Sequence, residues 1–150
     1  MSEYQFNQHQ RFAVFSTHGP KCYINNCPID MQTMEIDHVI PEFLAADRTR
    51  LDQVIADLGL PLDFDINSYE NWLPSCRKCN RQKSNLVFEP SLLLQRHLQV
   101  AAKKAAKARE LEHKAVTELA LSRAINTILR AVEGQTISDE TLVPLIETIR

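Results

Sequence analysis

The residues best suited to chemistry lie in three short stretches of the chain. One group consists of four cysteines in two close pairs: Cys22, Cys27, Cys76 and Cys79. Between the pairs stands the dipeptide Asp37-His38, and two asparagines, Asn71 and Asn80, flank the second pair. Thiolates at such spacings are typical of structural zinc sites, whereas carboxylate and amide oxygens suit Mg²⁺ or Mn²⁺. The sequence therefore predicts two different metal sites.

The cysteines are expected to bind zinc rather than to pair as disulfides. The N-terminus has neither a basic stretch nor an apolar stretch of the kind found in signal peptides, which favours a cytoplasmic location where thiols stay reduced. An all-cysteine tetrahedral site leaves no position for water, so its role would be structural, fastening residues 22–27 to residues 76–79. Such sites contribute on the order of 10 kcal/mol of folding free energy. The alternatives are four free thiols or two disulfides.

The Asp37-His38 pair has the minimum composition for metal-assisted hydrolysis of a phosphodiester. Aspartate is a hard oxygen ligand, and a neutral histidine can take a proton from water near neutral pH. Adjacent residues of a regular strand face opposite sides. The two side chains can therefore share a site only if the strand twists or ends there, which the nearby Pro41 favours.

The two asparagines extend this second site. Asn80 lies three residues before Lys83 on an expected helix, so both can point the same way, and its oxygen could complete a metal site opposite Asp37. Asn71 could hydrogen-bond the backbone and hold the loop that presents His38. Taken alone, Asn71 reads as a turn residue and Asn80 as a helix cap.

Together, these motifs resemble the HNH nuclease family in its zinc-bearing ββα-metal form. The matching stretches are Cys-x4-Cys, Glu-Ile-Asp-His-Val-Ile-Pro and Asn-Trp-Leu-Pro-Ser-Cys-x2-Cys-Asn-x2-Lys, within roughly residues 12–88. The resemblance implies a ββα-metal fold and divalent-ion-dependent endonuclease cleavage of DNA. It implies that His38 is the general base, that Asp37 and Asn80 bind Mg²⁺ or Mn²⁺, and that Asn71 orients the loop. With Asn80 in the last position, this is the His-Asn-Asn variant; the first cysteine pair, commonly two residues apart in the family, has four residues between its members here.

Contacts with DNA are expected from basic residues around the second cysteine pair. The net charge of -2 gives no general argument for nucleic acid, but a nuclease needs only a basic face. Four residues lie beside the expected site and could neutralise phosphates: Arg77, Lys78, Arg81 and Lys83. For the first three, an ordinary solvated face is an equal alternative.

The spacing of the apolar residues and the positions of Gly and Pro predict an α+β fold, with a small ββα core, flanking helices and a long helical extension. Helices are expected over about residues 5–17 and 48–58, and strands over 34–40 and 71–75, followed by a short helix over 78–85. Residues 91–133 contain neither Gly nor Pro and predict one long helix or two, with a break near residues 109–113. A last helix, capped by Ser138, is expected over 138–150.

These elements suggest a nuclease domain over residues 1–90 and a helical extension over residues 91–150. Within the extension, apolar residues at alternating spacings of three and four predict helix–helix contact, inside the chain or across a homodimer: Leu94, Leu98, Ala101, Ala105 and Ala108. The extension could also contact DNA. No stretch approaches the roughly 18 apolar residues of a membrane span.

A different class of function stays open at this point. The chain could be a non-catalytic zinc module that binds DNA or a protein partner, with the cysteines retained for folding and Asp37-His38 incidental. The joint presence of Asp37, His38, Asn71 and Asn80 argues against it.

Overall fold

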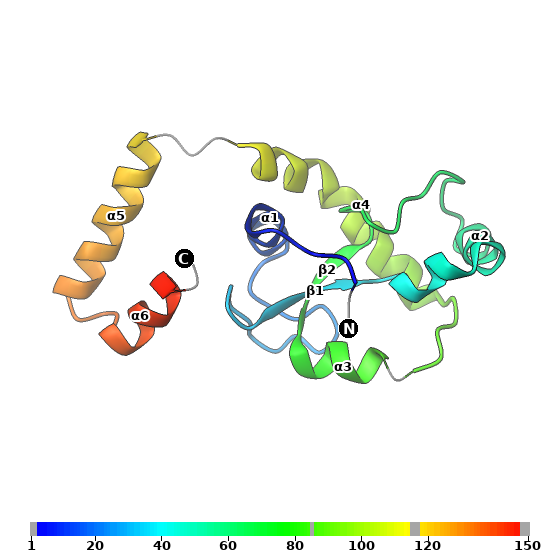
Figure 1. Cartoon of the computed structure of the whole chain (residues 1–150), viewed down its shortest axis with the longest axis horizontal. Helices are drawn as coiled ribbons and strands as arrows, with labels where there is room; N and C mark the ends of the chain where they lie inside the picture. Colours follow the sequence, from blue (N-terminus) through cyan, green and yellow to red (C-terminus); the bar gives the residue numbers. More distant parts are fainter. Residues whose placement is uncertain (1–2, 85, 115–117, 148–150) are drawn as a thin grey trace. The chain divides into compact units, whose positions relative to one another are not determined.

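The computed structural model of the chain describes residues 3–84, 86–114 and 118–147. The fold is α+β, and its elements in chain order are α1 (Gln8–His18), β1 (Met34–His38), the 3-10 helix η1 (Glu42–Ala46), α2 (Arg48–Asp57), β2 (Trp72–Cys76), α3 (Arg77–Ser84), α4 (Leu92–His113), α5 (Glu118–Glu133) and α6 (Asp139–Glu147) (Figure 1). Two compact units divide the chain, one over Met1–His113 and one over Lys114–Arg150.

The centre of the first unit is a strand–strand–helix arrangement. β1 and β2 pair antiparallel, with Ile36 opposite Pro74 and His38 opposite Trp72. α3 follows β2 without an intervening residue and contacts both strands (Figure 1). The expected strands and short helix are therefore present, although β1 ends at His38 and the end of the helix expected at residue 85 lies outside the described residues.

Helices α1 and α4 pack on each other beside this sheet (Figure 1). Asn7 begins α1 with a reciprocal cap, since Gln10 donates its backbone N–H to the Asn7 side chain and accepts from the Asn7 backbone. On α4 the small residues Ala105 and Ala108 are buried in the same cluster as Ala13 and Val14 of α1. At Ala105 and Ala108, the apolar pattern that predicts a helix–helix contact therefore meets a helix of the same chain.

This packing places α4 in the first unit. The boundary between the two units falls at His113, so the division expected after residue 90 lies inside the first unit. Of the two possibilities predicted for residues 91–133, one long helix or two, the structure has two, since α4 ends at His113 and α5 begins at Glu118.

The long connection between β1 and β2 contributes most of a second apolar cluster, which β2 and α4 complete. Asp47 caps α2 by accepting the backbone N–H of Arg50, and Gly59, with φ of 67°, follows the end of the helix. Leu51, Val54 and Ile55 of α2 are buried in the same cluster as Leu98 and Ala101 of α4. This cluster supports the end of the sheet at which Asp37 and His38 lie.

The second unit consists of α5, a turn and α6. The turn after α5 is closed by hydrogen bonds from Gly134 and Thr136 to the Arg130 and Ala131 carbonyls. Pro144 lies inside α6, and residues 148–150 of the expected last helix lie outside the described residues. Along α5, four large apolar residues are about half exposed: Leu121, Ile125, Ile128 and Leu129.

Among the described residues, none of the helices is both long enough and apolar enough to cross a bilayer.

Candidate functional site

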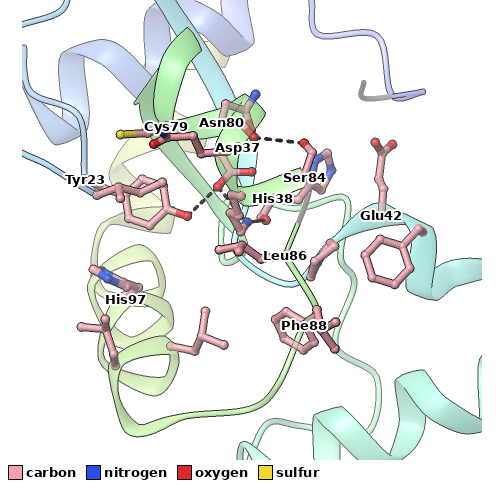
Figure 2. Close-up of a pocket in the computed structure, with 18 of the residues that line it drawn as sticks. Tyr23, Asp37, His38, Glu42, Cys79, Asn80, Ser84, Leu86, Phe88 and His97 are labelled. Carbon is pink, nitrogen blue, oxygen red and sulfur yellow. Dashed lines mark hydrogen bonds and ion pairs between the residues drawn. The ribbon is translucent and has the colours of Figure 1, made fainter.

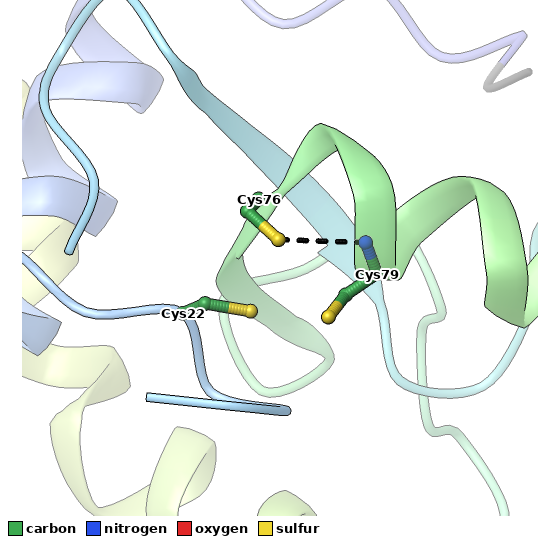
Figure 3. Close-up of side chains that lie close together, drawn as sticks. All are labelled: Cys22, Cys76 and Cys79. Carbon is green, nitrogen blue, oxygen red and sulfur yellow. Dashed lines mark hydrogen bonds between the residues drawn. The ribbon is translucent and has the colours of Figure 1, made fainter. Parts of the chain in front are cut away.

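Three cysteines meet at the junction of β2 and α3 (Figure 3). The sulfurs of Cys22, Cys76 and Cys79 all lie within 4.8 Å of one another. Tetrahedral zinc with bonds of about 2.3 Å places its sulfur ligands about 3.8 Å apart, so the group is close to the geometry of a metal site. The backbone N–H of Cys79 also donates to the Cys76 sulfur at 3.4 Å, which supports a thiolate there. The chain thus has a three-cysteine group that could hold a metal ion.

Cys27 lies in the same loop as Cys22. Two backbone hydrogen bonds close this loop: the Cys22 N–H donates to the Cys27 carbonyl at 2.9 Å, and the Cys22 carbonyl accepts from the Asn26 N–H. The turn places Asn26 at a φ of 59°. Desolvation first, and then the neighbouring thiols of Cys76 and Cys22, raise the pKa of Cys27. The fourth cysteine is therefore a neighbour of the group, although its sulfur is outside the close set of three.

A pocket of about 610 Å³ lies beside this cluster (Figure 2). Its walls include polar groups from β1 and α3, among them Asp37, Asn80 and Lys83. The rest of the lining is largely apolar and includes Phe43 of η1, Phe88 of the segment after α3 and Leu94 of α4. The strand–strand–helix unit therefore brings the predicted ligands Asp37 and Asn80 to one cavity.

The carboxylate of Asp37 is held through one of its oxygens. Oδ2 accepts a hydrogen bond from the Tyr23 hydroxyl and pairs with the Lys83 ammonium at 2.8 Å. Burial first, and then the Asp37 charge, raise the pKa of Tyr23, so that its hydroxyl stays protonated and donates. Within the described residues, Asp37 Oδ1 accepts no hydrogen bond, which leaves it available to a ligand in the pocket.

Asn80 presents its amide in a defined orientation. Its Nδ2 donates to Glu35 Oε2 at 2.7 Å, and an ionised carboxylate can only accept, so the nitrogen must face Glu35. The carbonyl oxygen Oδ1 therefore points elsewhere and accepts no hydrogen bond from the part of the chain described. Glu35 also pairs with Arg77 at 3.1 Å. Asp37 and Asn80 thus each offer one uncommitted oxygen, which is the donor type that Mg²⁺ or Mn²⁺ requires.

The imidazole of His38 has surroundings that differ from those of Asp37. The residue is 5% exposed, and its Nε2 lies 2.9 Å from Asn67 Oδ1. The rings of Phe6, Tyr4 and Trp72 surround it, with centroid separations of 5.6, 6.1 and 6.2 Å. Because β1 continues through His38, the two adjacent side chains follow the alternation of a strand and contact different residues. The structure brings Asp37, Asn80 and His38 to the lining of one pocket, but it does not join the imidazole to the Asp37 carboxylate.

Asn71 fastens the backbone just after His38. It is fully buried, its Oδ1 accepts from the Ile40 backbone N–H at 2.8 Å, and its Nδ2 donates to the carbonyls of Ile40 and Ile66 at 3.0 and 2.9 Å. Its own carbonyl accepts from Val39 at 2.8 Å. The side chain thereby joins the loop after β1 to the loop before β2, as the sequence predicts.

Replacing this side chain should strongly destabilise the first unit. Asn71→Ala leaves three buried backbone groups without partners, at roughly 1–3 kcal/mol each, and we expect a loss of about 3 kcal/mol or more in the free energy of unfolding. Urea unfolding of zinc-loaded protein, followed by the fluorescence of Trp72, the sole tryptophan, measures it. The exposed Asn126→Ala on α5 should change stability by less than about 0.5 kcal/mol. Equal stability of the two variants would contradict the role given to Asn71.

The four basic residues expected to contact DNA are placed differently from one another. Lys78 and Arg81 are exposed on α3 and form no ion pair within the described residues. Arg77 is exposed but pairs with Glu35, and Lys83 is only partly exposed. The ammonium of Lys83 is committed to Asp37 and to the His38 carbonyl, so it lies inside the pocket wall.

Sequence reasoning missed three residues of this site. Tyr23 and Asn67 contact Asp37 and His38, and Glu35 orients Asn80. Tyr23 directly follows the first cysteine of the loop, and Glu35 stands two residues before Asp37 on the same face of β1, so the strand period could have identified Glu35. For Asn67 no signal in the sequence distinguishes it from an ordinary loop residue.

Comparisons with known proteins give no relative for this chain: no protein-family model, curated protein or solved structure matches it.

Proposed function

We propose that the chain is an endonuclease of the HNH type that hydrolyses phosphodiester bonds in DNA with the help of a divalent metal ion. The observation that carries this proposal is the convergence of Asp37 from β1 and Asn80 from α3 on one pocket, each with an uncommitted oxygen. The order of strand, strand and helix, fastened by cysteines at the strand–helix junction, agrees with the family that the motifs resemble.

The proposed ligands of the catalytic ion are Asp37 and Asn80. Both are oxygen donors, which favours Mg²⁺ or Mn²⁺ over softer metals. An ion held there would supply charge neutralisation at the scissile phosphate. The pocket is open enough, at about 610 Å³, to admit a phosphate and its sugar beside the two ligands.

His38 is the proposed general base. Its Nε2 lies 2.9 Å from Asn67 Oδ1, which can only accept, so this nitrogen carries the proton in that contact. To take a proton from water, Nε2 must leave Asn67 and the ring must carry its own proton on Nδ1 instead. Asn71 serves this step indirectly, since it fixes the backbone at Ile40, two residues after the histidine. The step needs the neutral imidazole, in which one ring nitrogen can accept a proton.

We propose that all four cysteines hold a structural zinc ion. The close set of Cys22, Cys76 and Cys79 supplies three sulfurs, and Cys27 completes the tetrahedron after a small movement of its side chain. A site filled by four protein sulfurs has no open position for substrate, so its contribution is to hold the loop 22–27 against the start of α3.

We propose that Lys78 and Arg81 make the first contacts with the phosphates of DNA. Both are exposed on the helix that carries Asn80 and are free to neutralise the backbone of the substrate. Arg77 can join them if it leaves Glu35, an exposed pair that stabilises little. Pairing of two chains through the C-terminal helices stays a prediction; it would allow both strands of DNA to be cut, and it draws support from the half-exposed apolar residues of α5.

A second candidate is a zinc-bound module without catalytic activity that binds DNA or a protein. The specific observation in its favour is the environment of His38, which is buried beneath Tyr4 and Phe6 and is bonded to Asn67. In that reading the ion pair between Asp37 and Lys83 is a structural contact.

Nicking of supercoiled plasmid separates the two candidates. Zinc-loaded protein should convert supercoiled to open-circular DNA in Mg²⁺ or Mn²⁺, and omission of the added divalent ion should stop the reaction. A gel-shift assay on the same DNA without added divalent ion supplies the comparison. Binding without cleavage under every divalent ion tried would favour the non-catalytic module and contradict the proposed nuclease.

A further inference from the structure

Tyr23 connects the cysteine cluster to the carboxylate of Asp37. It directly follows Cys22 in the chain, and its backbone N–H donates to the Pro74 carbonyl of β2 at 2.9 Å. Its ring meets that of His97 edge-on, with centroids 4.9 Å apart. A tyrosine side chain has only two main torsions, so a fixed backbone and a packed ring place the hydroxyl with little freedom.

That hydroxyl holds one oxygen of Asp37 and leaves the other uncommitted (Figure 2). Lys83 contacts the same oxygen, Oδ2, from α3. A carboxylate bound through Oδ2 from two sides cannot rotate freely, so the direction of Oδ1 is set by the positions of Tyr23 and Lys83. The Tyr23 contact therefore fixes where Asp37 can offer an oxygen to an ion.

We propose that Tyr23 is a positioning residue that couples the cysteine site to the ion-binding carboxylate of Asp37. The inference rests on the proposed function, because it takes Asp37 as a ligand of the catalytic ion. A metal at the cysteines holds Cys22, the loop carries Tyr23 with it, and the phenol orients Asp37. The coupling therefore predicts that the second ion binds less tightly whenever the hydroxyl is removed, even while the cysteine site stays filled.

The test is Mn²⁺ binding to zinc-loaded protein, measured by calorimetry and by the electron paramagnetic resonance signal of free Mn²⁺. Tyr23→Phe removes the hydroxyl alone, and we expect it to weaken Mn²⁺ binding about five- to tenfold while one equivalent of zinc is retained. The matched control is Tyr69→Phe, which removes another tyrosine–carboxylate bond of the same unit, from Tyr69 to Glu112 at 2.8 Å. The control should bind Mn²⁺ as the wild type does, so that a general loss of stability is separated from loss of positioning.

The outcomes distinguish this inference from the function on which it rests. If the wild type binds Mn²⁺ and the Tyr23→Phe variant binds it equally or more tightly, the positioning role is overturned and the nuclease proposal stays intact. An equal loss of affinity in both phenylalanine variants also overturns it, since the effect would then be one of stability. Zinc-loaded wild type that binds no Mn²⁺ overturns the proposed function and this inference with it.

Discussion

His38→Ala is expected to abolish nicking of plasmid DNA, with a loss in rate of about 10²–10⁴-fold, the range typical of a missing general base. The reason is that His38 is the sole histidine of β1 and α3, and that His97 of α4, which also lines the pocket, is packed edge-on against Tyr23. The rate of conversion of supercoiled to open-circular DNA, at saturating Mg²⁺, measures the loss.

Because His38 is packed among aromatic rings, its removal also leaves a cavity, and the fold must be checked separately. His38→Gln keeps a polar side chain of similar length and should be folded yet as slow as the alanine variant. His9→Ala, on the exposed side of α1, should cut at the wild-type rate. Zinc content and Trp72 fluorescence report the fold in each case. Folded His38 variants that nick as fast as the wild type would show that this residue is not the base.

Removal of the cysteine-bound metal is expected to unfold the first unit. Structural zinc contributes on the order of 10 kcal/mol of apparent binding free energy, which is comparable to the 5–15 kcal/mol by which a typical domain is stable. Cys79→Ser takes away one of the three converging sulfurs and should lose both zinc and the cooperative urea transition. Chelation of zinc from the wild type should give the same result, and addition of zinc should reverse it.

Cys27→Ser distinguishes a four-cysteine site from a three-cysteine site. With four ligands, the variant should bind zinc at least about tenfold more weakly, since it loses a charged ligand. A Cys27→Ser protein with wild-type zinc affinity would limit the site to Cys22, Cys76 and Cys79. A Cys79→Ser protein that retains one equivalent of zinc and full stability would contradict the metal site altogether.

Local patterns in the sequence predicted the elements that carry the site. The strand at Met34–His38, the strand at Trp72–Cys76 and the helix after it follow from β-rich residues, from Pro74 and from the polar run after Cys76. The convergence of Cys22 with the later pair could be predicted because thiols at ligand spacing seldom occur in pairs without a shared metal. The role of Asn71 as a support for the loop also agrees with its observed bonds.

Contacts between distant segments could not be predicted in the same way. The pairing of Lys83 with Asp37 follows from the packing of α3 against β1, a contact between distant segments that no local pattern encodes, while its predicted contact with phosphates stays a prediction. The burial of His38 depends on the N-terminal segment, whose Tyr4 backbone N–H donates to Glu42 Oε1 at 2.8 Å from far along the chain. The alanines of α4 signalled a helix contact but did not identify α1 as the partner, and so the first unit extends beyond residue 90.

The most direct test of the account is the Mg²⁺ dependence of plasmid nicking by zinc-loaded Asp37→Asn beside the wild type. The asparagine keeps the shape of the side chain but removes the charge that is proposed to hold the ion. We expect wild-type nicking to rise with Mg²⁺ to saturation and the variant to be slower by about a hundredfold or more at every concentration, because several kcal/mol of charge stabilisation are lost. Nicking by folded Asp37→Asn at the wild-type rate, with the same Mg²⁺ dependence, would contradict it.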